Sequence, residues 1–199
     1  MSARGGQLKA EVVAFKRRRI LEVAAHLFYE RGYEGTPLEQ LSEALQVTTP
    51  YLYSYFQSKG EILLDVCQVG IQEPLSALDE ALAEGGTPSV RLRSASHRIA
   101  EIVIDKREYI VVYQRNAANL PADSATAIRG IRRTFDTKLT NLLEEGVSTG
   151  EFHMDDPGIT ATTIVSILSW LPNWYQPDGR LSLHDVRELT VKLIMRLVL

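Results

Sequence analysis

Apolar residues recur at the three- and four-residue spacing of an α-helix along almost the whole chain, and no run alternates as a half-buried strand would. In the first clear segment, for example, Ile20, Ala24 and Leu27 fall on one face. Proline and glycine residues divide the pattern into segments. We therefore predict an all-α fold of about nine helices. The second helix is expected to begin at residue 36, and the fourth to run from residue 58 to a break at residue 74. The other expected helices cover residues 15–31, 49–56, 87–105, 107–116, 122–149, 157–172 and 183–199.

The basic side chains gather near the N-terminus, although the chain of 199 residues has a net charge of −3. Residues 1–60 carry eight Lys and Arg against six Glu, a net charge of +2, which leaves −5 for the remainder. Phosphate binding requires local positive charge rather than a positive total. The asymmetry fits a small DNA-facing end on an acidic body, and a solvated basic tail would look similar.

The single cysteine, Cys67, excludes an internal disulfide and a cysteine-based zinc cluster. It lies in an apolar helical run, which predicts a buried, unreactive thiol. We find no stretch long enough to cross a bilayer and no signal peptide, so we expect a bacterial, cytoplasmic protein.

The segment 36–59 reads as two short helices joined by a tight turn. Val47, Leu52 and Phe56 share one face of the second helix, and the other positions are rich in hydroxyl groups. Hydroxyl groups bond phosphate oxygens and base edges. This pattern is typical of a helix-turn-helix, whose second helix enters the major groove. The alternative is a helical hairpin whose tyrosines pack against another subunit.

Two local signals support the boundaries of these helices. Thr36 is predicted to cap the first helix, with Pro37 at its first position, and this N-terminus would offer N–H groups to a phosphate. Ser58 with Glu61 predicts a second capping box at the start of the next helix. Lys59 would add a charge contact to DNA.

The run from Arg17 to Leu63 resembles the N-terminal domain of the TetR family of transcriptional repressors. Three residues depart from the family pattern: Gln46 replaces the usual turn Gly, Pro50 a small residue and Ser54 a frequent His. Residues 1–12 are basic and lack a clear helix start, so we expect them to be loose. The resemblance implies a DNA-binding domain 13–60 and a ligand-binding and dimerisation domain 61–199. It also implies DNA contacts by Thr36, Thr48, Thr49, Tyr51, Tyr53, Ser54, Tyr55 and Lys59.

TetR-like proteins are all-helical dimers that bind a small ligand in a helix-lined cavity. The last two predicted helices are too apolar for lone surface helices, which favours a homodimer. A dimer is also expected because a protein that binds a symmetric operator needs two DNA-binding domains for the two half-sites. The other interpretation of these residues is a core within one chain. The predicted interface comprises Ile164, Ile167, Leu168, Leu171, Val186, Leu189, Leu193 and Leu197.

The loop before the last helix contains the pattern Trp-Tyr-x-Pro-x-Gly-x-Leu-Ser, which resembles TetR regulators that respond to acyl-CoA in fatty-acid and steroid catabolism. Pro177 and Gly179 suit a turn, so the motif is expected to serve architecture. Arginines in the surrounding helices would suit the phosphates of an acyl-CoA, although solvated helix faces look the same. The predicted ligand residues are Arg93, His97, Tyr109, Tyr113 and Arg129.

The sequence contains no nucleophile elbow, phosphate-cradling glycine loop, metal-ligand histidine spacing or paired carboxylates. We therefore predict no enzyme activity, no cofactor and no metal. The expected function is a ligand-responsive repressor that binds a palindromic operator and is released by a hydrophobic or acyl-CoA effector. A different hydrophobic effector, an acyl-CoA-processing enzyme and a helical adaptor remain alternatives.

Overall fold

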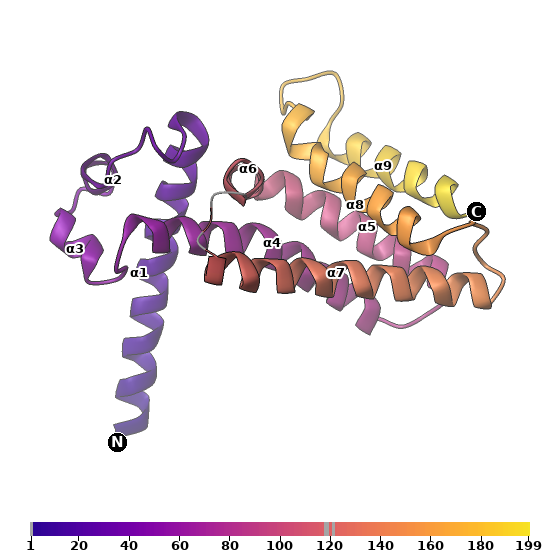
Figure 1. Ribbon diagram of the computed structural model, residues 1–199, viewed down its shortest axis with the longest axis horizontal. Coiled ribbons are helices and arrows are strands. Elements are labelled where there is room, and N and C mark those ends of the chain that lie inside the picture. The colour runs from indigo at the N-terminus through magenta and orange to yellow at the C-terminus, as the bar shows by residue number, and fades with distance from the viewer. Residues whose placement is uncertain (1, 118–119, 121) are drawn as a thin grey trace.

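The computed structural model describes residues 2–117, 120 and 122–199, and within these residues the chain forms nine α-helices and no strand. The predicted all-α fold is confirmed, and Figure 1 shows the arrangement of the helices. They are α1 (Ser2–Arg31), α2 (Leu38–Ala44), α3 (Thr49–Tyr53), α4 (Lys59–Ala83), α5 (Pro88–Asp105), α6 (Arg107–Asn116), α7 (Ala122–Ser148), α8 (Pro157–Trp174) and α9 (Leu183–Val198).

Helices α1, α2 and α3 lie at one end of the molecule, and α4 leads from them into a bundle made by α5 to α9 (Figure 1). Helix α6 packs against α1 as well as against α4 and α8. Both α4 and α6 therefore connect the small N-terminal end to the larger bundle. None of the described helices is long and apolar enough to span a membrane.

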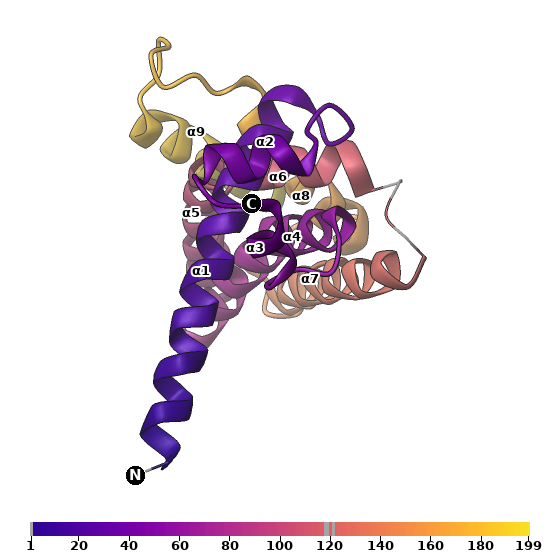
Figure 2. The ribbon, with the colours of Figure 1, turned by 90° about the vertical axis from the view of Figure 1, so that its left-hand side faces the viewer.

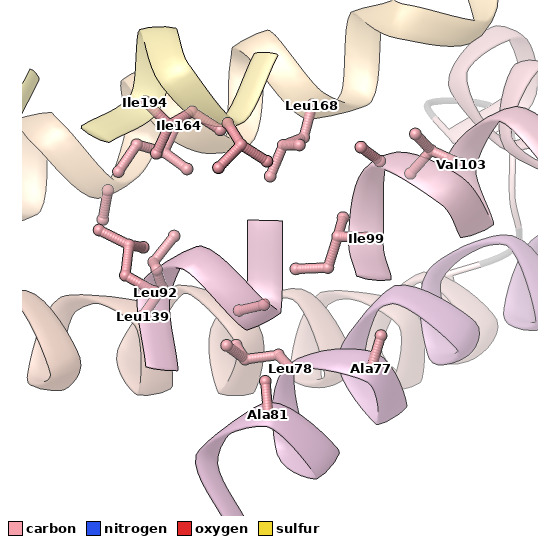
Figure 3. Packing of buried hydrophobic residues seen from close by; sticks show 14 of the residues in the cluster. Ala77, Leu78, Ala81, Leu92, Ile99, Val103, Leu139, Ile164, Leu168 and Ile194 are labelled. Atoms are coloured by element: carbon pink, nitrogen blue, oxygen red, sulfur yellow. The ribbon is translucent and has the colours of Figure 1, made fainter. Parts of the chain in front are cut away.

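Two clusters of buried apolar residues hold the fold together. The N-terminal core includes Leu41, Leu52 and Phe56 from the helix-turn-helix segment and Phe28 from α1. The C-terminal core joins α4, α5, α7, α8 and α9, and Figure 3 shows Leu78, Ile99, Leu139, Ile164 and Ile194 among its members. Each fully buried aliphatic or aromatic side chain stabilises the fold by about 1.5–3 kcal/mol.

Helix α4 contributes to both cores. Its first half supplies Ile62, Val66 and Cys67 to the N-terminal core, and its second half supplies Leu78 and Ala81 to the C-terminal core. Cys67 is fully buried, as predicted, and burial raises the pKa of its thiol to about 12. The N-terminal core also includes Val112, Leu120 and Ile128, so it extends well beyond residue 60.

The predicted helix break at Pro74 is wrong, because α4 continues through this residue. An internal proline removes one backbone hydrogen bond and costs about 3 kcal/mol. Ile71, Leu75 and Leu78 are buried around it, and their packing outweighs that cost. Helix α8 likewise continues past its predicted end at Pro172 to Trp174.

Helix α1 begins at Ser2 rather than near Phe15. The side chains of residues 6–15 are exposed, so tertiary packing does not hold this part of the helix. No proline interrupts the segment, and its residues from Gln7 onward suit a helix that the packed half of α1 has already nucleated. The looseness of residues 1–12 stays a prediction.

The predicted N-cap at Ser58 is present. The Ser58 hydroxyl accepts a hydrogen bond from the Glu61 amide at 3.1 Å, but the Glu61 carboxylate accepts from the Gln57 amide, so the predicted reciprocal box is only half formed. Ser182 and Asp185 make a complete capping box at α9. Helix α3 ends at Tyr53, three residues before its predicted end.

Candidate nucleic-acid interface and ligand cavity

The turn between α2 and α3 depends on one residue in an unusual backbone conformation. Gln46 has a φ of 56°, in the left-handed region that favours glycine. The Val47 amide bonds to the Ser42 carbonyl at 2.9 Å and closes the turn. The Thr48 side chain then caps α3, and Pro50 lies in its first turn, where its missing N–H has no helical partner.

Helix α3 turns its apolar side inward and its hydroxyl groups outward. Leu52 and Phe56 are buried in the N-terminal core, whereas the Tyr53 side chain is 54% exposed. We call the predicted contact residues from 48 to 59 the reading surface. On it, Thr48, Tyr53 and Ser54 are exposed, and Thr49, Tyr51, Tyr55 and Lys59 are half-buried.

Lys16 of α1 lies beside the reading surface, although it is not one of the predicted contact residues. Its Nζ is 5.8 Å from the centre of the Tyr51 ring, and the Tyr51 and Tyr55 rings lie 5.0 Å apart. Interaction with the Tyr55 hydroxyl, and then with Tyr51, raises the pKa of the Lys16 ammonium. The seven-residue spacing between Lys9 and Lys16 shows that the two side chains share one side of α1. Nothing in the sequence shows that this side lies against α3.

Thr36 does not cap α2, contrary to the prediction. Its side chain is 1% exposed, and its hydroxyl donates to the carbonyl oxygens of Gly32 at 2.8 Å and Leu27 at 3.3 Å. Pro37 takes the cap position, without a side-chain hydrogen bond. The hydroxyl instead ties the loop before α2 to the end of α1, so the side chain is not placed to contact a phosphate.

Lys59 is held at the N-terminus of α4 by an aromatic neighbour. Its Nζ lies 4.2 Å from the centre of the Tyr33 ring, a cation–π contact. Tyr33 in turn packs edge-on against Phe28, with ring centres 5.3 Å apart, and burial raises the pKa of its phenol. The ammonium is thereby held over the Tyr33 ring at the start of α4.

Arg17 fastens α3 to α4. Its guanidinium donates to the Tyr55 carbonyl, to Glu61 Oε1 at 3.2 Å and to Asp65 Oδ2 at 2.6 Å, and it lies 4.1 Å from the centre of the Phe56 ring. Arginine suits this position because its planar donors reach several acceptors at once. In the sequence, Arg17 is distinguished only as part of a basic run.

A cavity of about 200 Å³, partly open to solvent, lies where the two cores meet. Ile71, Tyr113 and Ile131 belong to its N-terminal side, and Val103 and Phe135 pack against the C-terminal core. Helices α4 to α8 all contribute to the lining, which comprises Gly70, Ile71, Pro74, Ile99, Val103, Ile110, Tyr113, Gln114, Ile131, Arg132, Phe135, Asp136, Val165, Leu168 and Ser169.

The cavity wall is mostly apolar, with few polar groups. Gln114 donates to the Ser169 carbonyl at 2.8 Å and accepts from Asn173 at 3.0 Å, so its amide is already engaged. Arg132 and Asp136 are exposed where the cavity borders solvent. Gly70 brings α4 close to α6, since a Cβ there would lie 2.8 Å from the Tyr109 carbonyl oxygen. No metal-binding group of three or more side chains occurs among the described residues.

Only one of the five predicted ligand residues, Tyr113, lines this cavity. Tyr109 packs against the N-terminal core, where burial raises its pKa to about 12. His97 Nε2 lies 3.5 Å from a Glu188 carboxylate oxygen on α9. Arg93 and Arg129 are exposed, and the Arg129 guanidinium donates to Thr126.

Most of the other arginines of this domain are engaged in the fold. Arg98 pairs with Glu80 and Glu84, and Arg91 pairs with Glu145. These arginines are therefore surface and structural residues rather than ligand-binding residues. Arg132 is the arginine that the cavity includes.

Helix α6 links the cavity wall to α1. On one side it supplies Ile110, Tyr113 and Gln114 to the cavity. On the other side, Glu108 Oε1 lies 2.8 Å from His26 Nδ1, and the Arg115 guanidinium donates to the Tyr29 carbonyl at 2.7 Å. His26 is exposed on α1 and is paired with Glu108 of α6.

The guanidinium groups of Arg107 and Arg115 also lie over the Tyr29 ring, at 5.4 and 5.3 Å from its centre. Tyr29 is therefore held from two sides by one helix, through its ring and its backbone. A displacement of α6 by a molecule in the cavity would act directly on α1.

The predicted interface residues divide into two sets. Ile164, Leu168, Leu171 and Val186 are buried in the C-terminal core of the same chain, so their assignment to an interface is wrong. Leu189, Leu193 and Leu197 are exposed along one face of α9, and Ile167 is half-buried. Both helices are apolar on more than one face, and spacing alone did not show which face turns inward.

Helix α8 carries its own exposed apolar face, made by Ile159, Trp170 and Trp174. These three residues lie on one side of the helix by the 3.6-residue period. We call the exposed apolar residues of α8 and α9 the outer face. Soluble monomers rarely expose an apolar surface of this kind without using it.

The loop from Tyr175 to Ser182 joins α8 to α9. Tyr175 is buried in the C-terminal core, and its carbonyl oxygen accepts a hydrogen bond from Arg107 at 3.5 Å. Gly179 fits closely, because a Cβ there would lie 2.9 Å from the Gln176 carbonyl oxygen. The expected architectural role of the motif agrees with this packing, and none of residues 175–182 lines the cavity between the cores.

The helix-turn-helix, the helical bundle and the cavity together define a one-component transcriptional regulator. Two family models match the chain: "Bacterial regulatory proteins, tetR family" over residues 20–66 and "Tetracyclin repressor-like, C-terminal domain" over residues 85–198. The chain belongs to the TetR family, as the sequence resemblance predicted. Members of this family are transcriptional regulators, so the prediction that the chain is not an enzyme is confirmed.

Relatives in this family share low identity with the chain over most of its length. The transcriptional repressor KstR2 of Rhodococcus jostii is 22% identical over 90% of this chain and 89% of its own. The crystal structure of PfmR from Thermus thermophilus is 30% identical, with a TM-score of 0.83, over 89% of this chain and 97% of its own. AibR, in complex with isovaleryl coenzyme A and operator DNA, is 24% identical, with a TM-score of 0.81, over 89% and 96%.

Proposed function

We propose that the chain is a homodimeric repressor that binds a palindromic operator in the bacterial cytoplasm and leaves it when an acyl thioester enters the cavity. The observation that carries the proposal is the reading surface, a row of exposed hydroxyl groups on a short helix, backed by a buried core and flanked by cations. Tyr53, Thr48 and Lys59 supply donors to DNA, and phosphate contacts of this kind position the helix.

Dimerisation follows from the outer face. Leu193 is 54% exposed and Trp170 is 62% exposed on adjacent helices of the bundle. Burying such side chains stabilises an interface, and a two-fold dimer presents two reading surfaces to two half-sites. We therefore assign Leu189, Leu193, Leu197 and Trp170 to the interface between two copies of the chain.

Release follows from the position of the cavity between the two cores. A molecule that fills it contacts α4 and α6, which also hold α1 and the helix-turn-helix. Occupation favours dimers in which the spacing of the two reading surfaces does not match the operator. This is a population shift, whose size is set by the difference in effector affinity between the two states.

The effector class follows from the contrast between the cavity wall and its border. The interior is lined by Ile99, Val103, Phe135 and similar residues, which suit an acyl chain. Arg132 lies at the border, and no ion pair is found for it among the described residues, so it is available to a phosphate. AibR, which has the same fold, is seen with isovaleryl coenzyme A.

The test is binding to the DNA upstream of the chain's own gene, measured by fluorescence anisotropy at stated salt, with CoA thioesters and the matching free acids added. We expect tight binding that a short or steroid-type CoA thioester releases and its free acid does not. If the free acid or an unrelated hydrophobic compound released the DNA, the effector would not be a CoA thioester. Absence of sequence-specific binding would favour an adaptor.

A further inference from the structure

The N-terminal half of α1 is a helix without a packing partner. Residues 6–15 are exposed, and Figures 1 and 2 show this part of the helix projecting past α2 and α3 with no other element covering it. From Phe15 back to Ser2 it spans about 20 Å, at 1.5 Å per residue. A structured projection of this length beside the reading surface calls for a binding partner.

The charge of this segment identifies the kind of partner. Residues 1–19 contain six basic side chains and one acidic side chain, Glu11. Lys16 already lies at the reading surface, beside Tyr51 and Tyr55. Lys9 is exposed seven residues earlier, two helical turns and about 10.5 Å away on the same side of α1. Glu11, two residues from Lys9, projects to the opposite side by the same period.

We propose that Lys9 and Lys16 form a basic edge of α1 that binds the phosphate backbone next to the half-site read by α3. The basic edge extends the contact with DNA by two helical turns beyond the reading surface. It contributes affinity and salt dependence, and it does not select base sequence. The inference rests on the proposed operator binding and adds a second contact region to it.

The same helix carries an apolar side, made by Leu8, Val12 and Phe15, which lies about a quarter of a turn away from the basic edge by the helical period. A second copy of the chain could pair with that side. The charge and the position of Lys16 favour DNA as the partner of the basic edge, and pairing between copies is an outcome that the experiment separates.

The experiment measures the operator association constant of the full chain at several salt concentrations for the unchanged protein, Lys9→Gln, and Lys9→Gln with Lys16→Gln. Each lost phosphate contact lowers the slope of log affinity against log salt by about 0.9, so a dimer loses about 1.8 with the single change. The double change is expected to lower it by about 3.6. Sedimentation of each variant without DNA reports its oligomeric state.

Arg18→Gln is the matched control, because it removes the same charge from the same helix. Arg18 lies two residues from Lys16, on the opposite side of α1, where its charge acts on Tyr109. Its slope is expected to equal that of the unchanged protein. Equal slopes for Lys9→Gln and the unchanged protein, or a change only in oligomeric state, would overturn the inference. An unchanged protein without operator binding would overturn the proposed function itself.

Discussion

The reading surface and the cavity are built in opposite ways. The reading surface comes from twelve consecutive residues, 48–59, on one short helix and its flanks, supported from behind by Leu52 and Phe56. The cavity is lined by five helices, α4 to α8, and its walls belong to both cores. A residue of the reading surface is therefore replaceable with little effect on the fold, whereas a change in the cavity wall is transmitted to two cores.

The largest effect is expected at the outer face, on which both regions depend if the chain binds DNA as a dimer. Leu193→Arg places a charge in the centre of the proposed interface, and leaving it unpaired and buried is strongly unfavourable. We expect monomers and a loss of operator affinity of at least about 100-fold, because one reading surface then binds alone. Ultracentrifugation measures the first and anisotropy the second.

Ser148→Arg, on the exposed end of α7, is the control for adding the same charge elsewhere. A Leu193→Arg protein that stays dimeric would place the interface on another face of the bundle.

A cavity-filling change should separate release from binding. Val165→Trp adds a large ring where Val165 lines the cavity, and we expect the effector concentration for half-release to rise at least about tenfold. Operator affinity without effector is measured in parallel: a ring that acts as a fixed occupant of the cavity lowers it, and a ring that only blocks entry leaves it unchanged. Val90→Trp, at an exposed valine of α5, is the matched control. Unaltered release would exclude this cavity as the effector site.

The converse change is Tyr53→Phe, which removes one exposed hydroxyl from the reading surface. A hydrogen bond to a charged group contributes about 1.5–3 kcal/mol, so operator affinity should fall at least about tenfold. The melting temperature and the effector affinity of the protein without DNA should not change. Tyr29→Phe, on α1 against α6, is the control. Full affinity in Tyr53→Phe would contradict the assignment of α3 as the reading helix.

Stability at alkaline pH should depend on Cys67. Its folded-state pKa is about 12, above the ordinary value of 9.0, so the unfolded chain loses the thiol proton first as the pH rises. Below about pH 9 the thiol is neutral in both states and has no effect on the pH dependence. Above it, the free energy of unfolding should fall by up to about 1.4 kcal/mol per pH unit. Tyr109, raised to about 12 in the same way, adds a similar slope above pH 10.

Chemical unfolding of the unchanged protein and of Cys67→Ala between pH 8 and 10 measures this contribution. The difference in stability between the two proteins should shrink as the pH rises. A difference that is constant over this range would show that the thiol is not desolvated in the folded state.

The smallest effect is expected at the turn of the helix-turn-helix. Gln46 adopts a left-handed conformation that costs a residue with a Cβ about 1–2 kcal/mol, and glycine adopts it freely. Gln46→Gly also gains entropy in the unfolded chain, which offsets part of the gain. We expect a net stabilisation of up to about 1 kcal/mol in urea unfolding. Destabilisation would mean that the Gln46 side chain makes a contact that outweighs the strain.

The same contrast explains what could be predicted from the sequence. A local pattern predicts helix α3, its buried Leu52 and its exposed Tyr53. The sequence also shows the turn, where Gln46 replaces the glycine that is usual in the family. The cavity is an outcome of packing between helices far apart in the chain, so only Tyr113 of the predicted ligand residues lines it. The wrong interface assignments have a related cause. Apolar spacing identified α8 and α9 but not which of their faces turns inward, as the buried Ile164 and the exposed Leu193 show.

Helix α4 has a consequence for how the molecule unfolds. It carries Val66 into one core and Leu78 into the other without interruption, so neither core keeps its packing when the other is lost. A fragment ending at residue 60 lacks Ile62, Val66 and Ile71 and cannot complete the N-terminal core. We expect a single cooperative transition in calorimetry, with equal calorimetric and van't Hoff enthalpies, for a chain that performs two tasks.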